Sequence, residues 1–237
     1  MRCRLVGSEM CIRDRKHIDQ VIVATDDERI ADHVKGFGGL AVMTDEGCAN
    51  GTERVYDACL KMGIEPEIIV NLQGDAPLTP PWFIQDLVDG MIAAGEKEQF
   101  ATVAEKMSWQ DLDHFVEAKK TTPASGTTVV CDQDMNALYF SKSVLPYLRK
   151  KPDSPLSPVW HHIGLYGYRF AGLKQYLAWP ETEIEKIEGL EQLRVLYHGE
   201  KMRVIAVEPK GRTMHPVDSP EDVIRVERIL DREGELS

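Results

Sequence analysis

The sequence has little cysteine, no long apolar run and no excess of basic residues. Its five cysteines are widely spaced and include no Cys-x-x-Cys pair, which argues against a disulfide framework and a cysteine-rich zinc site. No apolar run approaches the roughly 18–20 residues of a membrane span, and the N-terminus lacks the apolar stretch of a signal peptide. We therefore expect a soluble protein of the cytoplasm.

The charge balance excludes a further set of partners. Lysine and arginine number 28 against 39 aspartates and glutamates, for a formal net charge of −11. Nucleic acids and anionic membrane surfaces both require a basic face, so we expect neither as a partner. A nucleotide that binds together with a divalent cation is compatible with this negative charge, because carboxylates hold the cation in such a site.

The motifs of several enzyme classes are also missing. There is no Gly-x-Ser-x-Gly, no Walker A motif, no dinucleotide-binding Gly-x-Gly-x-x-Gly and no histidine pair at zinc-ligand spacing. The adjacent His161 and His162 would point to opposite faces of a strand. Serine- and cysteine-nucleophile enzymes are therefore disfavoured.

What the chain does contain is an alternation of strand-like and helix-like segments. Apolar runs predict strands at 21–25, 40–44, 68–72, 162–169 and 202–207, and a hairpin at 127–131 and 137–140. Helical periodicity and capping residues predict helices after Asp27, Asn50, Pro80 and Ser219 and over 184–197, with a loop at 150–158. The pattern indicates an α/β, three-layer Rossmann-like fold with a mostly parallel sheet and an antiparallel excursion at about 125–180. We assign residues 16–237 to this domain and 1–15 to a foreign-looking leader.

Two polar segments follow predicted strands or open predicted helices. Asp75 lies just past the carboxyl end of strand 68–72, where open α/β sheets place ligands, and Gln73 points to the same side if the chain stays extended. Turn formation by Gly-Asp explains Asp75 equally well. Residues 50–54 form a polar helix N-terminus that could receive an anion, although capping is the simpler explanation.

Three further candidates lie in the second half. In strand 162–169, alternation places His162 and Tyr166 on one face around Gly164, a gap that lets a ligand approach, although an ordinary buried strand is favoured. Helical periodicity makes Glu191 and Gln192 solvent-facing. Asp218 lies just before a predicted helix N-terminus, where a negative charge interacts favourably with the helix dipole, and this alone explains the residue.

Together these segments resemble the 3-deoxy-manno-octulosonate cytidylyltransferases (CMP-Kdo synthetases). The resemblance covers 16–231 and rests on VIVATDDERIADHVKGFGG, NGTERV, IIVNLQGDAPL, NALYFSKSVLP, HHIGLYGYR, LEQLRVLYHGEKMRV and VDSPEDVIRV. It implies a nucleotidyltransferase fold and transfer of CMP from CTP to 3-deoxy-D-manno-octulosonate (Kdo) or a close analogue. Pyrophosphate would leave, and the product would feed lipopolysaccharide synthesis. A homodimer formed through the hairpin region is also implied.

The resemblance also implies roles for individual residues. Asp75 and Asp218 would act in catalysis as ligands of Mg²⁺, a cation that prefers hard oxygen donors. The residues implied in substrate binding, including two that periodicity alone makes solvent-facing, are Asn50, Thr52, Arg54, Gln73, His162, Tyr166, Glu191 and Gln192.

The sequence departs from the family at several positions. Ala76 replaces an acidic residue, Thr128 replaces a lysine, and Asn50 replaces a serine. Family members also begin with a strand, a basic triphosphate-binding loop and a helix, which this sequence lacks before Lys16. We therefore expect the chain as written to be unstable or inactive. The alternatives are a non-catalytic nucleotide- or sugar-binding remnant, a related glycosyltransferase and a sialic-acid-type cytidylyltransferase.

Overall fold

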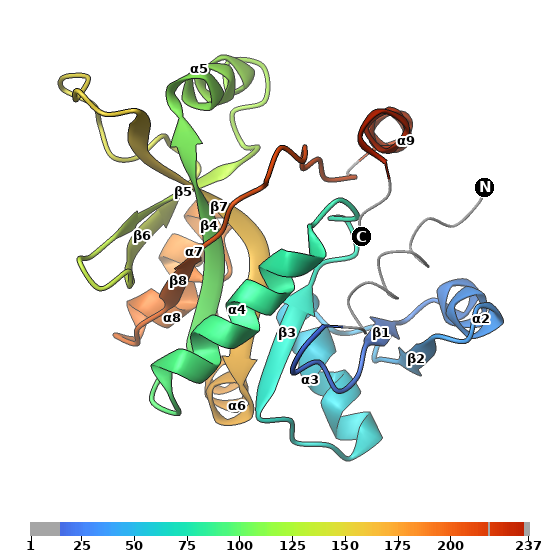
Figure 1. The fold of residues 1–237 in the computed structure, drawn as a ribbon. Coiled ribbons are helices and arrows are strands. Elements are labelled where there is room, and N and C mark those ends of the chain that lie inside the picture. Colours follow the sequence, from blue (N-terminus) through green and yellow to red (C-terminus); the bar gives the residue numbers. More distant parts are fainter. Residues whose placement is uncertain (1–14, 218, 235–237) are drawn as a thin grey trace.

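A computed structural model describes residues 15–217 and 219–234 (Figure 1). The first half contains β1 (Ile22–Thr25), α2 (Glu28–Gly36), β2 (Leu40–Met43), α3 (Gly51–Met62), β3 (Ile68–Leu72), α4 (Pro81–Ala94), β4 (Phe100–Ser108) and α5 (Trp109–Ala118). The second half contains β5 (Thr127–Cys131), β6 (Ala137–Ser141), β7 (Leu156–Arg169), α6 (Phe170–Ala178), α7 (Glu183–Glu188), α8 (Leu193–Tyr197), β8 (Arg203–Ala206) and α9 (Pro220–Glu233). The leader prediction falls almost wholly outside the described residues and stays a prediction.

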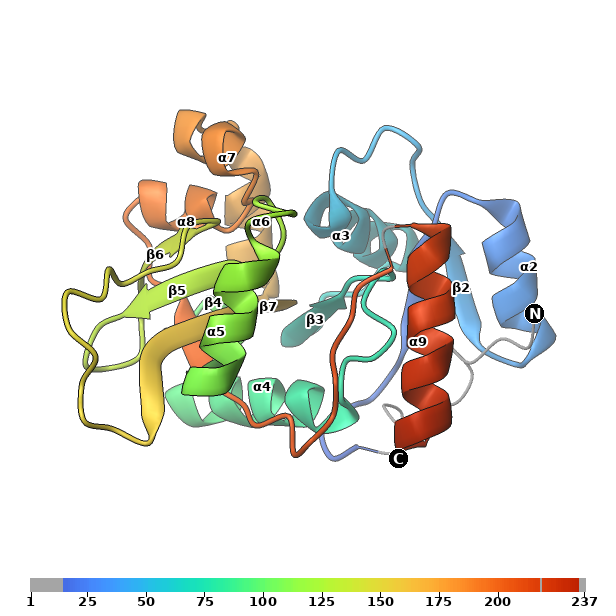
Figure 2. The ribbon, with the colours of Figure 1, turned by 90° about the horizontal axis from the view of Figure 1, so that it is seen from above.

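The described strands form two sheets. β1 and β2 make a parallel pair, and six strands make the larger sheet in the order β6-β5-β7-β4-β8, with β3 also paired to β7. In the larger sheet β3, β4, β5 and β8 run in one direction, and β6 and β7 run against them. Helices flank this mixed sheet, which confirms the predicted α/β class and its antiparallel excursion. Figure 2 shows β2 and α2 at one end of the molecule and β5 and β6 at the other.

The long strand β7 creates an opening in the larger sheet. One edge of β7 pairs with β4. The other edge pairs with β5 as far as His162 and with β3 from Leu165 onward. Gly164 therefore lies in the interval where the end of β3 and the start of β5 diverge. On this edge, the backbone in the interval has no strand beside it among the described residues, so a ligand can approach β7 there.

Two apolar clusters cover the faces of the larger sheet. On one face α4 packs against β4 and β7, and Phe83, Leu87 and Met91 are fully buried. Burial of each such side chain stabilises the fold by about 1.5–3 kcal/mol. α4 approaches β7 at Gly167, where a Cβ atom would collide with the Met91 sulfur. The opposite cluster joins β4, β5 and β7 to α6 and α8.

Three differences from the sequence prediction affect the site. β4 and α5 are not predicted, and β7 begins at Leu156 inside the expected 150–158 loop. The helix expected over 184–197 is two short helices, α7 and α8, separated by a turn. Gly189 ends α7 in the left-handed conformation, with φ of 64°, which breaks the helical path.

No helix in the ranges 15–217 and 219–234 is both long and apolar enough to cross a membrane. Cys48, Cys59 and Cys131 are free thiols.

Candidate functional site

A cavity opens where β3 and β5 diverge along β7. Its volume is about 410 Å³. We call it the β7 cavity, lined by Asn50, Gly51, Gln73, Gly126, Thr127, Lys142, His162, Gly164, Tyr166, Gly189, Leu190, Glu191 and Gln192. The lining combines neutral hydrogen-bonding groups with one lysine and one carboxylate, a set suited to an anionic ligand rich in hydroxyl groups.

A second cavity adjoins the first. It has a volume of about 580 Å³ and shares Asn50, Gly189, Leu190 and Glu191 with the β7 cavity. We call it the α7 cavity; its remaining lining residues are Ala49, Glu53, Leu177, Trp179, Glu181, Glu185, Lys186 and Arg194. The shared residues form the wall between the two spaces, so Glu191 reaches both.

The N-terminus of α3 supplies part of this wall. Asn50 caps the helix, since its Oδ1 accepts a hydrogen bond of 2.9 Å from the Glu53 backbone N–H. The hydroxyl of Thr52 is buried, donates to Glu191 Oε2 at 3.0 Å and lies 3.1 Å from the Tyr168 hydroxyl. Thr52 therefore holds the shared carboxylate in place.

Arg54 lies apart from both cavities. Its guanidinium forms an ion pair of 2.7 Å with Asp26 and donates to the Thr44 hydroxyl at 2.7 Å. Arg54 thereby ties α3 to the ends of β1 and β2. Of the substrate-binding residues expected in 50–54, the structure brings Asn50 to the cavities and places Thr52 directly behind Glu191.

The turn after α7 directs two predicted ligands inward. Helical periodicity predicts that Glu191 and Gln192 face solvent. This prediction is wrong because the helix ends at Gly189. Gln192 is 2% exposed, and its Oε1 accepts a hydrogen bond of 3.3 Å from the Tyr166 hydroxyl. Burial raises the pKa of Glu191.

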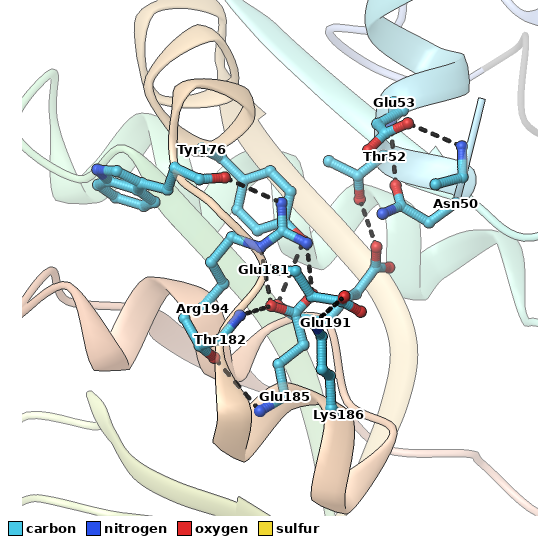
Figure 3. A network of polar contacts seen from close by, with 12 residues as sticks. Asn50, Thr52, Glu53, Tyr176, Glu181, Thr182, Glu185, Lys186, Glu191 and Arg194 are labelled. Carbon is cyan, nitrogen blue, oxygen red and sulfur yellow. Dashed lines mark hydrogen bonds and ion pairs between the residues drawn. The ribbon is translucent and has the colours of Figure 1, made fainter. Parts of the chain in front are cut away.

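A buried ion pair stabilises this turn (Figure 3). The Arg194 guanidinium donates to both oxygens of Glu185, at 2.8 and 2.6 Å, and its carbon lies 4.4 Å from the Tyr176 ring centroid. The Tyr176 hydroxyl donates to the Glu191 carbonyl at 3.3 Å. These contacts connect α7, α8 and α6 around the backbone of Glu191.

Strand β7 contributes the opposite wall. His162 and Tyr166 both line the β7 cavity with Gly164 between them, as the alternation predicts. Burial, with a smaller electrostatic effect of the neighbouring His161 and Lys142, lowers the pKa of His162 to about 3, so its ring is neutral at pH 7. Burial raises the pKa of Tyr166 well above its ordinary value, and the charge of Glu191 adds to the effect. Both side chains therefore act as neutral hydrogen-bonding groups.

One of the two predicted metal ligands, Asp75, lies just past the carboxyl end of β3. Asp75 is exposed in the turn after this strand, and its charge contributes to the raised pKa of Tyr166 in the cavity wall. The Val217 backbone N–H donates to the Asp75 carbonyl at 2.7 Å, which brings the chain before α9 to this turn. Asp218 itself lies outside the described residues.

Asp75 could hold Mg²⁺ only in a site that substrate completes. No group of three potential metal-ligating side chains occurs within 15–217 and 219–234. Mg²⁺ commonly binds one or two carboxylates together with phosphate oxygens and water, so substrate and water would supply the remaining ligands.

Sequence reasoning missed several residues of the site. Lys142 and Thr127 line the β7 cavity, and Thr102 bonds the ring of His162 from behind it at 2.9 Å. Thr102 belongs to the unpredicted strand β4. A single hydroxyl within the apolar run 100–104 is the signal that could have identified it.

Comparisons with known proteins identify relatives of this chain. A cytidylyltransferase family model matches residues 11–202. The 3-deoxy-manno-octulosonate cytidylyltransferase of Maricaulis maris is 46% identical over 219 residues, covering 92% of this chain and 83% of the relative. The corresponding protein of Vibrio cholerae is 41% identical over 220 residues, covering 90% of this chain and 81% of the relative.

A solved structure has the same architecture. CMP:2-keto-3-deoxy-manno-octonic acid synthetase in complex with CTP aligns with a TM-score of 0.82 and 30% identity, over 97% of this chain and 88% of that chain. These relatives are nucleotidyltransferases, so the glycosyltransferase and remnant alternatives are not favoured. The chain belongs to the cytidylyltransferase family.

Proposed function

We propose that this protein transfers CMP from CTP to Kdo, releasing pyrophosphate. The anomeric hydroxyl of the sugar attacks the α-phosphorus of CTP in line, and the bond to the β-phosphate oxygen breaks. Such chemistry depends on positioning and on charge neutralisation more than on a covalent intermediate. The observation that carries the proposal is the β7 cavity, whose lining suits an acidic sugar, beside Asp75 in a chain related to CMP-Kdo synthetases.

The cavity lining suits each part of the sugar. Lys142 provides a positive charge for the sugar carboxylate, in a protein whose net charge is −11. Gln73, His162 and Gln192 provide neutral groups for the sugar hydroxyls. Gln192 has a buried Nε2 with no hydrogen-bond partner among the described residues, and a ligand oxygen would satisfy this donor.

Asp75 and Asp218 would hold Mg²⁺ when substrate is bound. The bound cation would neutralise charge on the phosphate oxygens. The hydrogen bond from Val217 to Asp75 supports this assignment, because it connects the segments that carry both aspartates. Asp75 would orient the reactants, and the Thr52–Glu191 contact would keep the opposite wall in position.

Product formation tests the proposal directly. The protein is incubated with CTP, MgCl₂ and Kdo or its 8-amino analogue, and pyrophosphate and the CMP-sugar are both measured. Asp75→Asn and Glu191→Gln should lower the rate at least about tenfold each, because each removes a charged contact. Asp153→Asn changes an exposed carboxylate outside both cavities and should leave the rate unchanged. The same assay is run on a version that carries a family-type N-terminal segment, and absence of CMP-sugar from both proteins with every acidic sugar would refute the assignment.

We further propose a homodimer that works in the cytoplasm and supplies lipopolysaccharide synthesis. Leu138 on β6, Ile187 on α7 and Tyr197 on α8 are 59%, 76% and 64% exposed, a concentration of apolar surface around the antiparallel region. Analytical ultracentrifugation should show a dimer. Leu138→Asp should shift it to monomer, whereas Leu60→Asp, at another exposed leucine on α3, should not.

A further inference from the structure

His162 makes an asymmetric set of contacts at the wall of the β7 cavity. Its Nε2 lies 2.9 Å from the Thr102 hydroxyl oxygen on the neighbouring strand β4. The ring packs edge-on against Phe140 and beside Tyr166, at centroid distances of 4.9 and 5.6 Å. Within 15–217 and 219–234 no group hydrogen-bonds Nδ1. Since the sheet engages Nε2, Nδ1 is the ring nitrogen that remains for a ligand.

The hydroxyl of Thr102 has three polar neighbours but only one proton. It lies 2.9 Å from the Leu165 carbonyl oxygen and 2.9 Å from His162 Nε2, and the more distant Ile163 carbonyl oxygen lies at 3.5 Å. The Leu165 carbonyl can only accept, so the hydroxyl must donate there for that contact to be favourable. The oxygen then accepts from Nε2, which must carry the ring proton.

The opposite arrangement forms fewer hydrogen bonds. If the hydroxyl donated to Nε2, the Thr102 hydroxyl oxygen and the Leu165 carbonyl oxygen would lie 2.9 Å apart with no proton between them. Thr102 is completely buried, so water cannot compensate for the lost contact. A backbone irregularity between Thr102 and Val103 in the β4–β7 pairing accompanies this local contact.

We propose that Thr102 is a positioning residue, whose hydroxyl holds His162 as the Nε2–H tautomer so that Nδ1 accepts a hydrogen bond from a hydroxyl group of the bound sugar. The inference rests on the proposed function for the identity of the ligand. Thr102 does not touch the ligand itself. It determines which sugar atom His162 recognises, because the other tautomer would present a donor to the cavity.

Nitrogen NMR tests the tautomer without substrate. In [¹⁵N]histidine-labelled full-length protein, long-range proton–nitrogen correlations distinguish a protonated ring nitrogen from an unprotonated one, and His162→Gln identifies the resonances. We expect Nε2–H in the wild type and in Thr102→Ser, which keeps the hydroxyl. Thr102→Val should lose this preference. An Nδ1–H tautomer in the wild type, or an unchanged tautomer in Thr102→Val, would overturn the proposal.

Kinetics test the consequence for the sugar. Thr102→Val should raise the KM for Kdo about tenfold, the effect of one hydrogen bond, and leave the KM for CTP unchanged. Thr102→Ser should restore the wild-type value. Thr128→Val is the matched control, because it also removes a buried strand hydroxyl bonded to backbone, at 2.7 Å from the Ser143 carbonyl, but it does not contact His162. Equal changes in both KM values would reject a specific role in sugar recognition.

The two assays separate the possible failures. If no acidic sugar gives a CMP-sugar, the proposed function fails while the NMR measurement still decides the tautomer. If product forms and the tautomer is Nδ1–H, only the role of Thr102 fails.

Discussion

Replacing Arg194 with methionine should destabilise the protein severely. The side chains of Arg194 and Glu185 are only 7% and 6% exposed, and their contact is bidentate. Methionine keeps much of the arginine volume but removes the charge and both donors. Glu185 would then remain buried with the Thr182 backbone N–H, at 3.2 Å, as its only hydrogen-bond donor within the described residues.

The magnitude follows from the burial of the pair. Removal of one partner of a buried ion pair costs about 3–5 kcal/mol, because the other charge is left without compensation. The double variant Glu185→Gln with Arg194→Met removes both charges, and glutamine preserves the capping box with Thr182. We expect the double variant to recover most of the loss and to remain within about 1.5 kcal/mol of the wild type.

Urea denaturation monitored by circular dichroism provides the measurement. The free energy of unfolding should be compared for the wild type, both single variants and the double variant. A loss under about 1 kcal/mol in Arg194→Met, or no recovery in the double variant, would refute the reasoning.

Three further predictions concern β7. Gly167→Ala should lower the free energy of unfolding by about 1–3 kcal/mol, measured by urea denaturation, because its Cβ collides with Met91. Gly164→Ala should change the free energy of unfolding by less than about 0.5 kcal/mol, because the added Cβ meets Gln73 at an ordinary 3.5 Å. The same substitution should raise the KM for the sugar, and an unchanged KM would contradict the assignment of the β7 cavity to the sugar. The pKa of His162 is about 3, against an ordinary value of 6.5, so only the unfolded chain gains this proton as the pH falls from 6.5 towards 3. The free energy of unfolding of the wild type should therefore fall more steeply in this range than that of His162→Gln. Parallel pH profiles of the two proteins would contradict this expectation.

Local sequence signals predict most of the fold. Strand 68–72 and the helix opened by Asn50 agree with β3 and α3, because their apolar periodicity and capping residues act within a few residues. β4 begins with the run 100–104, which is apolar except for Thr102, and its lack of periodicity does not distinguish a buried strand from a buried helix. The order of the strands around β7 depends on pairing between distant segments, which periodicity does not encode.

The candidate site shows the same limit more sharply. Glu191 and Gln192 occupy polar positions of a helical pattern, and that pattern is correct on both sides of them, in α7 and α8. One left-handed residue, Gly189, ends the first helix and turns these side chains from solvent towards β7. Only the family resemblance proposed them as ligands, because it compares whole segments and so includes the turn. Periodicity therefore identifies which residues can form the core, whereas the breaks between periodic segments determine which polar residues can form the site.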